Sequence, residues 1–163
     1  MKNKIKSTII ITAENQERLI ERCIKSCLNQ SVKNIEIIII FTKLKNINIL
    51  KKKYLSKNIV FLNITKKINK PTQDQLFKIK QGLLISKGKY IFLLDGDDTY
   101  KKNKVKEAIN SIKDKKVLFL DSHENNKDNI KQINKVHGFK ETNLYKTLIN
   151  TWPKGVCTSC IVL

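Results

Sequence analysis

An apolar run that ends in three carboxylates constrains this chain more than any other stretch. Residues 90–94 are all aromatic or aliphatic, and Asp95, Asp97 and Asp98 follow within four positions. A continuous apolar run predicts a strand buried on both faces, so the strand delivers acidic groups to the edge of a sheet. Carboxylates this close repel one another unless a cation lies between them, and their oxygens suit Mg2+ or Mn2+ with a phosphate as the remaining partner. We therefore expect a metal-bound phosphate ligand at this turn.

Three other interpretations compete for the same acidic residues. An EF-hand loop that begins at Asp95 needs Gly at its sixth position and Glu at its twelfth, where the chain has Tyr100 and Lys106, and this excludes it. The order Asp95-x-Asp97-x-Thr99 resembles the first motif of haloacid-dehalogenase-type phosphatases, in which the first Asp is a nucleophile and the second an acid/base. The acids could also simply cap the next helix. The phosphatase and cap interpretations stay open at this point.

Composition indicates one globular domain with a strongly basic surface. The 163 residues are 40% hydrophobic and 29% charged, and 33 Lys and Arg against 14 Asp and Glu give a formal net charge of +19. The lysines are scattered among isoleucines without aromatic stacking positions or a nucleic-acid motif, so we expect no nucleic-acid partner. Scattered lysines suffice for a peripheral contact with an anionic membrane.

The apolar run after the basic residues 1–6 is too short for a signal peptide or a membrane span, so we expect a cytoplasmic protein, with any membrane contact at the inner face.

The four cysteines form two close pairs, at residues 23 and 27 and at residues 157 and 160. A zinc site would need both pairs together, with only two histidines as substitutes. Cys23 and Cys27 lie on the apolar stripe of a predicted helix, so we interpret them as reduced core residues.

Strand and helix patterns alternate along the chain. Such alternation predicts the α/β class, with a mainly parallel sheet in three layers and helices on both faces. Ligands of such sheets collect beyond the carboxyl ends of the strands, and Asn15, Thr42 and Asp95 all follow strand ends. The expected strands span residues 7–11, 36–41, 58–62, 90–94, 117–120 and 157–163, and the expected helices span residues 17–28, 47–55, 73–86 and 102–113.

Three local expectations go with this pattern. Asn15 stands where it could cap the first turn of the first helix. The polar, Asn-rich residues 123–135 predict a loop. The inward face of the helix over residues 73–86 is expected to carry Leu76, Ile79, Leu83 and Leu84.

The first hundred residues resemble the N-terminal half of a family 2 glycosyltransferase with the GT-A fold. Residues 10–15 and 19–31 are similar to the opening strand and helix of that family, and residues 33–39 are similar to its second strand. Residues 86–98 are similar to the run into its DXD motif, at a similar distance from the start. This combination is more specific than the acidic residues alone, and it makes the phosphatase the second choice.

The resemblance implies a Rossmann-like GT-A domain. Its implied function is transfer of a sugar from a nucleotide-diphospho-sugar, typically a UDP-sugar, to a glycan or lipid-linked acceptor in glycan, polysaccharide or glycolipid biosynthesis. The implied cofactor is Mn2+ or Mg2+, with Asp97 as a metal ligand, Asp95 as a ligand of the metal or a contact of the ribose, and Asp98 supporting the turn. The implied donor-binding residues are Thr12, Ala13, Glu14, Asn15, Asp95, Gly96 and Asp97.

The chain departs from the family at three places. The family commonly has Pro and Tyr where this chain has Thr12 and Glu14, and an Asp-rich, base-holding turn where it has residues 41–43. The family's catalytic base follows the strand that residues 157–163 resemble, so no catalytic residue is assigned, with Asp121 or Glu124 as the fallback. We therefore expect residues 1–163 to form one donor-binding domain without the acceptor part, either a truncated enzyme or a non-catalytic nucleotide-sugar-binding module.

Overall fold

The computed structural model describes residues 7–55, 57–65, 68–112, 119–120, 123–125, 130–132 and 158–163. Within these residues, six strands form one sheet in the order β3-β2-β1-β4-β8-β5. The first four strands of this order are parallel to one another, and β8 lies antiparallel between β4 and β5. The strands are β1 (Ser7–Glu14), β2 (Ile35–Thr42), β3 (Ile59–Asn63), β4 (Tyr90–Asp95), β5 (Phe119–Leu120) and β8 (Ile161–Val162).

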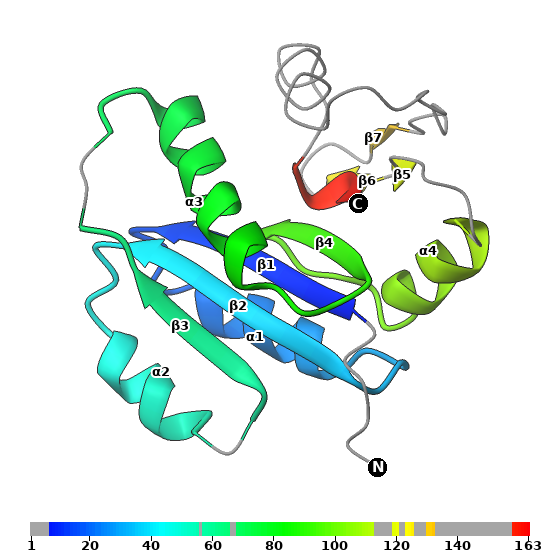
Figure 1. The fold of residues 1–163 in the computed structure, drawn as a ribbon, viewed down its shortest axis with the longest axis horizontal. Coiled ribbons are helices and arrows are strands. Elements are labelled where there is room, and N and C mark those ends of the chain that lie inside the picture. The colour runs from blue at the N-terminus through cyan, green and yellow to red at the C-terminus, as the bar shows by residue number, and fades with distance from the viewer. Residues whose placement is uncertain are drawn as a thin grey trace.

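Helices cover both faces of the sheet, as expected for a three-layer α/β fold (Figure 1). Alternate residues of each central strand face opposite layers: Ile9 and Ile11 belong to one apolar cluster, and Ile10 belongs to the other. This two-sided burial explains why the strands read as continuous Ile-rich runs. The first cluster includes residues of α1 (Ile20–Leu28), α2 (Ile47–Lys53) and α4 (Lys104–Ile112), and the second includes Ile79 of α3 (Pro71–Ile85).

Cys23 and Cys27 are buried, free core residues of α1, as predicted. The side chains of Cys157 and Cys160 lie outside the described part. In that part, no helix is both long and apolar enough to cross a bilayer.

The start of α1 differs from the prediction. Strand β1 continues to Glu14, and Asn15 then adopts a positive φ of 51° and is exposed. The first helical residue is Ile20, and the cap position is held by Leu19 without a side-chain hydrogen bond. The backbone N–H groups of Leu19 and Ile20 instead donate to the carbonyl of Gln16. The expected capping role of Asn15 is therefore wrong.

The inward face of α3 also differs from the prediction. Leu84 is 69% exposed, whereas Asp74, Lys78 and Gly82 are buried together with Ile79. Positions 74, 78 and 82 follow a spacing of four residues, which lies along one side of a helix. The charged residues can occupy this side because Asp74 and Lys78 neutralise each other in an ion pair of 2.5 Å.

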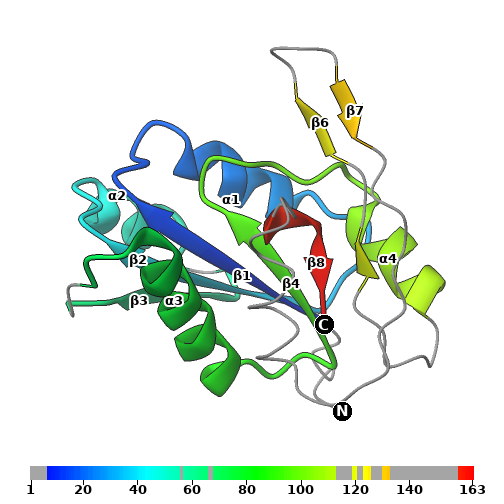
Figure 2. The same cartoon turned by 90° about the horizontal axis from the view of Figure 1, so that it is seen from above.

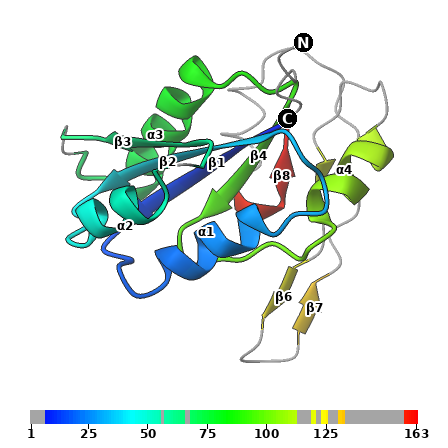
Figure 3. The same ribbon diagram turned by 90° about the horizontal axis from the view of Figure 1, so that it is seen from below.

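The predicted loop over residues 123–135 contains two strands, β6 (His123–Asn125) and β7 (Ile130–Gln132), which pair antiparallel. Figures 2 and 3 show this pair projecting away from the main sheet. Backbone pairing does not require an apolar pattern, so the polar sequence gave no sign of it.

A buried polar network joins the amino ends of three strands. Glu36, 1% exposed, accepts hydrogen bonds from the hydroxyl of Thr8 at 2.8 Å and from the backbone N–H of Lys87 at 3.0 Å. The N–H of Gly88 donates to the hydroxyl of Thr8 at 2.9 Å. A Cβ on Gly88 would lie 2.4 Å from the backbone nitrogen of Thr8. The entry into β4 therefore packs directly against the backbone of β1.

We expect Gly88→Ala to lower the free energy of unfolding by about 1 to 3 kcal/mol, because the new methyl group meets backbone that cannot move aside cheaply. Denaturant unfolding followed by circular dichroism measures this change. Leu84→Ala, on an exposed position shortly before it, serves as the control and should change the value by less than about 0.5 kcal/mol. Equal stability of the two variants would contradict the close packing.

Candidate functional site

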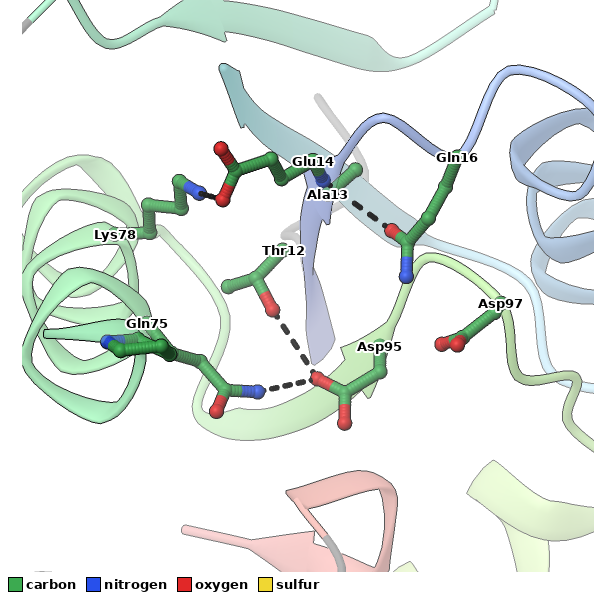
Figure 4. Close-up of a pocket in the computed structure, with 9 residues that line it drawn as sticks. Thr12, Ala13, Glu14, Gln16, Gln75, Lys78, Asp95 and Asp97 are labelled. Atoms are coloured by element: carbon green, nitrogen blue, oxygen red, sulfur yellow. Dashed lines mark hydrogen bonds and ion pairs between the residues drawn. The ribbon is translucent and has the colours of Figure 1, made fainter. Parts of the chain in front are cut away.

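The carboxyl ends of β1, β2 and β4 meet at one edge of the sheet. The register places Thr12 beside Asp95 and Glu14 beside Thr42, as expected for the ends of parallel strands. A pocket of about 250 Å³ opens at this edge (Figure 4). Its lining residues are Thr12, Ala13, Glu14, Gln16, Pro71, Gln75, Lys78, Asp95 and Asp97.

Asp95 ends β4 and lies at the floor of the pocket. Its Oδ1 accepts hydrogen bonds from the hydroxyl of Thr12 at 3.2 Å and from Nε2 of Gln75 at 2.6 Å. Burial raises the pKa of this carboxyl from 3.8 to about 6, and the nearby carboxylates of Asp98 and Asp97 also raise it, while the two hydrogen bonds lower it. The negative charge at Asp95 is therefore incompletely neutralised by the protein.

The turn after Asp95 is fixed by contacts from two other elements. The N–H of Asp98 donates to the carbonyl of Asp95 at 3.0 Å, and Arg22 of α1 donates to the carbonyl of Asp97 at 2.8 Å. From the short 3-10 helix Thr158–Cys160, the hydroxyl of Ser159 accepts from the N–H of Asp95 at 3.1 Å and donates to the carboxylate of Asp98. Asp98 is thus occupied in holding the turn, whereas Asp97 is exposed and lines the pocket.

Gly96 lets this turn approach β1 closely. Its N–H donates to the carbonyl of Thr12 at 2.9 Å. A Cβ on Gly96 would lie 2.4 Å from Oε1 of Gln16 and 2.9 Å from Cβ of Ala13. Any side chain at this position would therefore push the acidic turn away from β1.

Lys78 of α3 brings a cation to the opposite wall of the pocket. The side chain is 3% exposed, and its Nζ lies 2.5 Å from Oδ2 of Asp74 and 3.9 Å from Oε2 of Glu14. The other oxygen of Glu14 pairs with Lys43 at 3.1 Å. Figure 4 shows Glu14 and Lys78 on one side of the pocket and the two aspartates on the other.

The structure brings most of the residues expected from the sequence into one place. Five of the seven expected donor-binding residues line the pocket; Gly96 is packed behind it, and Asn15 is exposed beyond the end of β1. Sequence reasoning missed four lining residues: Gln16, Pro71, Gln75 and Lys78. The available signal for Lys78 was its position four residues after an aspartate, on a helix packed against a sheet. Asp121 and the side chain of Glu124 lie outside the described part.

The residues present fit a divalent cation that is shared with a ligand. In the described part, no group of three or more His, Cys, Asp or Glu side chains could hold a metal. Two carboxylates on one turn, one with a pKa raised by burial and by its acidic neighbours, match the few protein ligands that Mg2+ takes beside phosphate oxygens. Asp95 and Asp97 are therefore suited to hold such an ion jointly with a phosphate.

The raised pKa of Asp95 makes stability depend on pH. Between about pH 4 and pH 6 the folded protein keeps a proton that the unfolded chain releases, so the free energy of unfolding falls as pH rises through this range. Asp95→Asn has no carboxyl group to titrate at this position. We expect the variant's stability relative to wild type to increase from about pH 4 and to level off above about pH 6, at a difference of about 1 to 3 kcal/mol.

Denaturant titrations of metal-free protein across this pH range measure the difference. Asn110→Ala, which changes an exposed residue of α4 without a titratable group, is the control and should show no such trend. A constant difference between Asp95→Asn and wild type would mean that Asp95 has an ordinary pKa.

Solved structures of glycosyltransferases share this fold. Residues 1–349 of S. aureus TarS in complex with UDP-GlcNAc match with a TM-score of 0.63 and 20% identity over 78% of this chain and 37% of that chain. The mannosyltransferase PcManGT from Pyrobaculum calidifontis in complex with GDP-Man and Mn2+ matches with a TM-score of 0.62 and 13% identity over 78% of this chain and 38% of that one.

A synthase structure shares the fold with a lower TM-score. The 4-diphosphocytidyl-2C-methyl-D-erythritolsynthase from Anaerococcus prevotii matches with a TM-score of 0.55 and 16% identity over 93% of this chain and 75% of that chain. No curated protein matches the sequence.

These comparisons confirm the predicted GT-A, Rossmann-like α/β fold. The chain spans less than two fifths of the length of the TarS structures that it matches. The family model for glycosyl transferase family 2 matches residues 66–162, which is more than half of the chain, and the protein therefore belongs to this family.

Proposed function

We propose that the protein transfers a sugar from a nucleotide-diphospho-sugar to an acceptor, in glycan, polysaccharide or glycolipid biosynthesis. The observation that carries this proposal is the acidic turn of Asp95 and Asp97 in a pocket at the carboxyl edge of a parallel sheet. Membership of family 2 supports the reaction class. The similar structures that contain UDP-GlcNAc and GDP-Man support a nucleotide-sugar donor, and we propose a UDP-sugar.

The two walls of the pocket suggest how the donor is held. A diphosphate carries negative charge, so carboxylates beside it repel it unless a cation lies between them. Asp97 and Asp95 would hold Mn2+ or Mg2+ on one wall, whereas the charge of Lys78 on the other wall is already offset by its ion pair with Asp74. The metal, when bound, supplies Lewis-acid stabilisation of the charge that develops on the leaving diphosphate.

The remaining donor-binding residues then have distinct roles. Thr12 and Gln75 keep the carboxylate of Asp95 in one orientation through their hydrogen bonds. The lack of a Cβ on Gly96 lets the acidic turn lie against Ala13 and Gln16, which keeps the turn beside the pocket. Glu14, with Asn15 directly after it, forms the rim of the pocket at the end of β1.

The second candidate is a module that binds the donor without turning it over. The lining residues can account for donor binding, and none of those in the described part of the chain is assigned as the base that deprotonates an acceptor. The haloacid-dehalogenase-type phosphatase is not favoured, since the family match covers the acidic turn itself.

We also propose that the protein acts in the cytoplasm, in peripheral contact with the inner face of the membrane. The free cysteines Cys23 and Cys27 are compatible with a reducing compartment. The net charge of +19 favours attraction to anionic lipid, and the acceptor is then a glycan or a lipid-linked glycan.

Isothermal titration calorimetry tests the donor site. UDP should bind in the presence of Mn2+ or Mg2+ and not in the presence of a chelator. Asp97→Asn should weaken this binding about ten-fold or more, because a charge-assisted contact is worth roughly 1.5 to 3 kcal/mol. Asp97 is exposed and only its backbone carbonyl is engaged by Arg22, so the fold should be unaffected.

Glu107→Gln is the control, since it removes an exposed carboxylate of α4 that does not line the pocket, and it should bind UDP as wild type does. Metal-dependent binding of UDP without sugar transfer would favour the binding module. Hydrolysis of a generic phosphate ester that is lost in Asp95→Asn would favour the phosphatase. Absence of both activities in the wild-type protein would leave the acidic turn as a helix cap.

A further inference from the structure

The outward face of α2 exposes two large aliphatic side chains. Ile49 is 68% exposed and Leu55, just after the helix, is 86% exposed. Leu50 and Tyr54 are buried on the other side of this segment and attach it to the sheet. The core therefore fixes the orientation of the segment, and it leaves Ile49 and Leu55 directed away from the protein.

Exposed lysines neighbour these two side chains in the sequence. Lys51, Lys52 and Lys57 are exposed, and among the described residues none of the three forms an ion pair with a carboxylate. Lys53, which faces α1, is instead paired with Glu21 at 2.6 Å. We call Ile49, Lys51, Lys52, Leu55 and Lys57 the α2 surface. It combines positive charge with protruding apolar groups.

The α2 surface lies apart from the donor pocket. Figures 1 and 3 show α2 beside β3, at the opposite side of the sheet from β8, and no residue of α2 lines the pocket. A partner bound to this surface would therefore leave the pocket accessible.

We propose that the α2 surface binds the anionic headgroups of a lipid bilayer. Lysines near a membrane are attracted to acidic lipids, and aliphatic side chains beside them can enter the boundary between headgroups and acyl chains. Nucleic acid fits less well, because the one aromatic residue of the segment, Tyr54, is buried and unavailable for stacking on bases. This inference locates the peripheral membrane contact proposed above and does not depend on the transferase activity.

Co-sedimentation with lipid vesicles tests the proposal. The full chain should bind vesicles of mixed phosphatidylcholine and phosphatidylglycerol, and it should bind vesicles of phosphatidylcholine alone much more weakly. Lys51→Glu combined with Lys52→Glu should reduce the affinity for the mixed vesicles at least ten-fold, because two attractive charges become repulsive. Ile49→Ser combined with Leu55→Ser should reduce it several-fold and make the remaining binding more sensitive to salt.

Matched controls lie elsewhere on the surface. Lys102→Glu combined with Lys106→Glu makes the same change of charge on and beside α4, and Leu84→Ser removes a leucine that is as exposed as Ile49. Both controls should bind the mixed vesicles more tightly than the α2 variants do. Calorimetry with UDP and Mn2+ on every variant checks that the fold and the pocket are intact.

Each outcome separates the proposals. If the α2 variants bind vesicles as tightly as the controls, the α2 surface is not the membrane-binding surface, although the protein still binds membranes. If the wild-type protein does not bind the mixed vesicles, the peripheral membrane contact and its placement on the α2 surface are both overturned. If the α2 variants lose binding to single-stranded RNA but keep binding to vesicles, the surface serves nucleic acid and the proposal fails. Absence of UDP binding together with normal vesicle binding would overturn the proposed UDP-sugar donor site and leave the membrane surface in place.

Discussion

The candidate site depends on how closely the turn after β4 approaches the end of β1. Parallel pairing brings Thr12 beside Asp95, and the hydrogen bond from Gly96 to the carbonyl of Thr12 continues this contact one residue past the strand. Because Gly96 has no Cβ, Gln16 and Ala13 can pack against the turn. The carboxylate of Asp95 is thereby held in the pocket, partly buried, with its pKa raised.

The protein also contains a contrast in charge that bears on its proposed ligand. The chain as a whole carries a large positive charge, whereas the acidic turn concentrates three carboxylates at one point. A positive surface attracts an anionic nucleotide from solution, but the turn itself would repel it. A divalent cation held at the turn would offset most of this negative charge and would give the phosphate a cation to bind.

The residues that could be predicted from the sequence are those whose positions follow from local pattern. The Ile-rich strands and the acidic turn occupy consecutive positions, so the sheet, its layers and the location of Asp95 and Asp97 were predictable. Lys78 and Gln75 were missed because they lie on a helix whose inward face is decided by the sheet beneath it; apolar spacing had favoured Leu84 instead. The capping role expected of Asn15 failed for a similar reason, since pairing with β2 extends β1 to Glu14.

The contacts of Ser159 have a consequence for the order in which the site is assembled. Its hydroxyl joins Asp95 and Asp98, from which it is separated by 64 and 61 positions in the chain. The parallel strands β1, β2 and β4 can pair through contacts of their own, but the acidic turn gains its last restraints only when the segment around Ser159 has returned to the sheet. Closing such a long stretch of chain is slow and entropically costly. During synthesis on the ribosome the sheet can therefore form first, and the carboxylates take up their final geometry only after Ser159 has emerged.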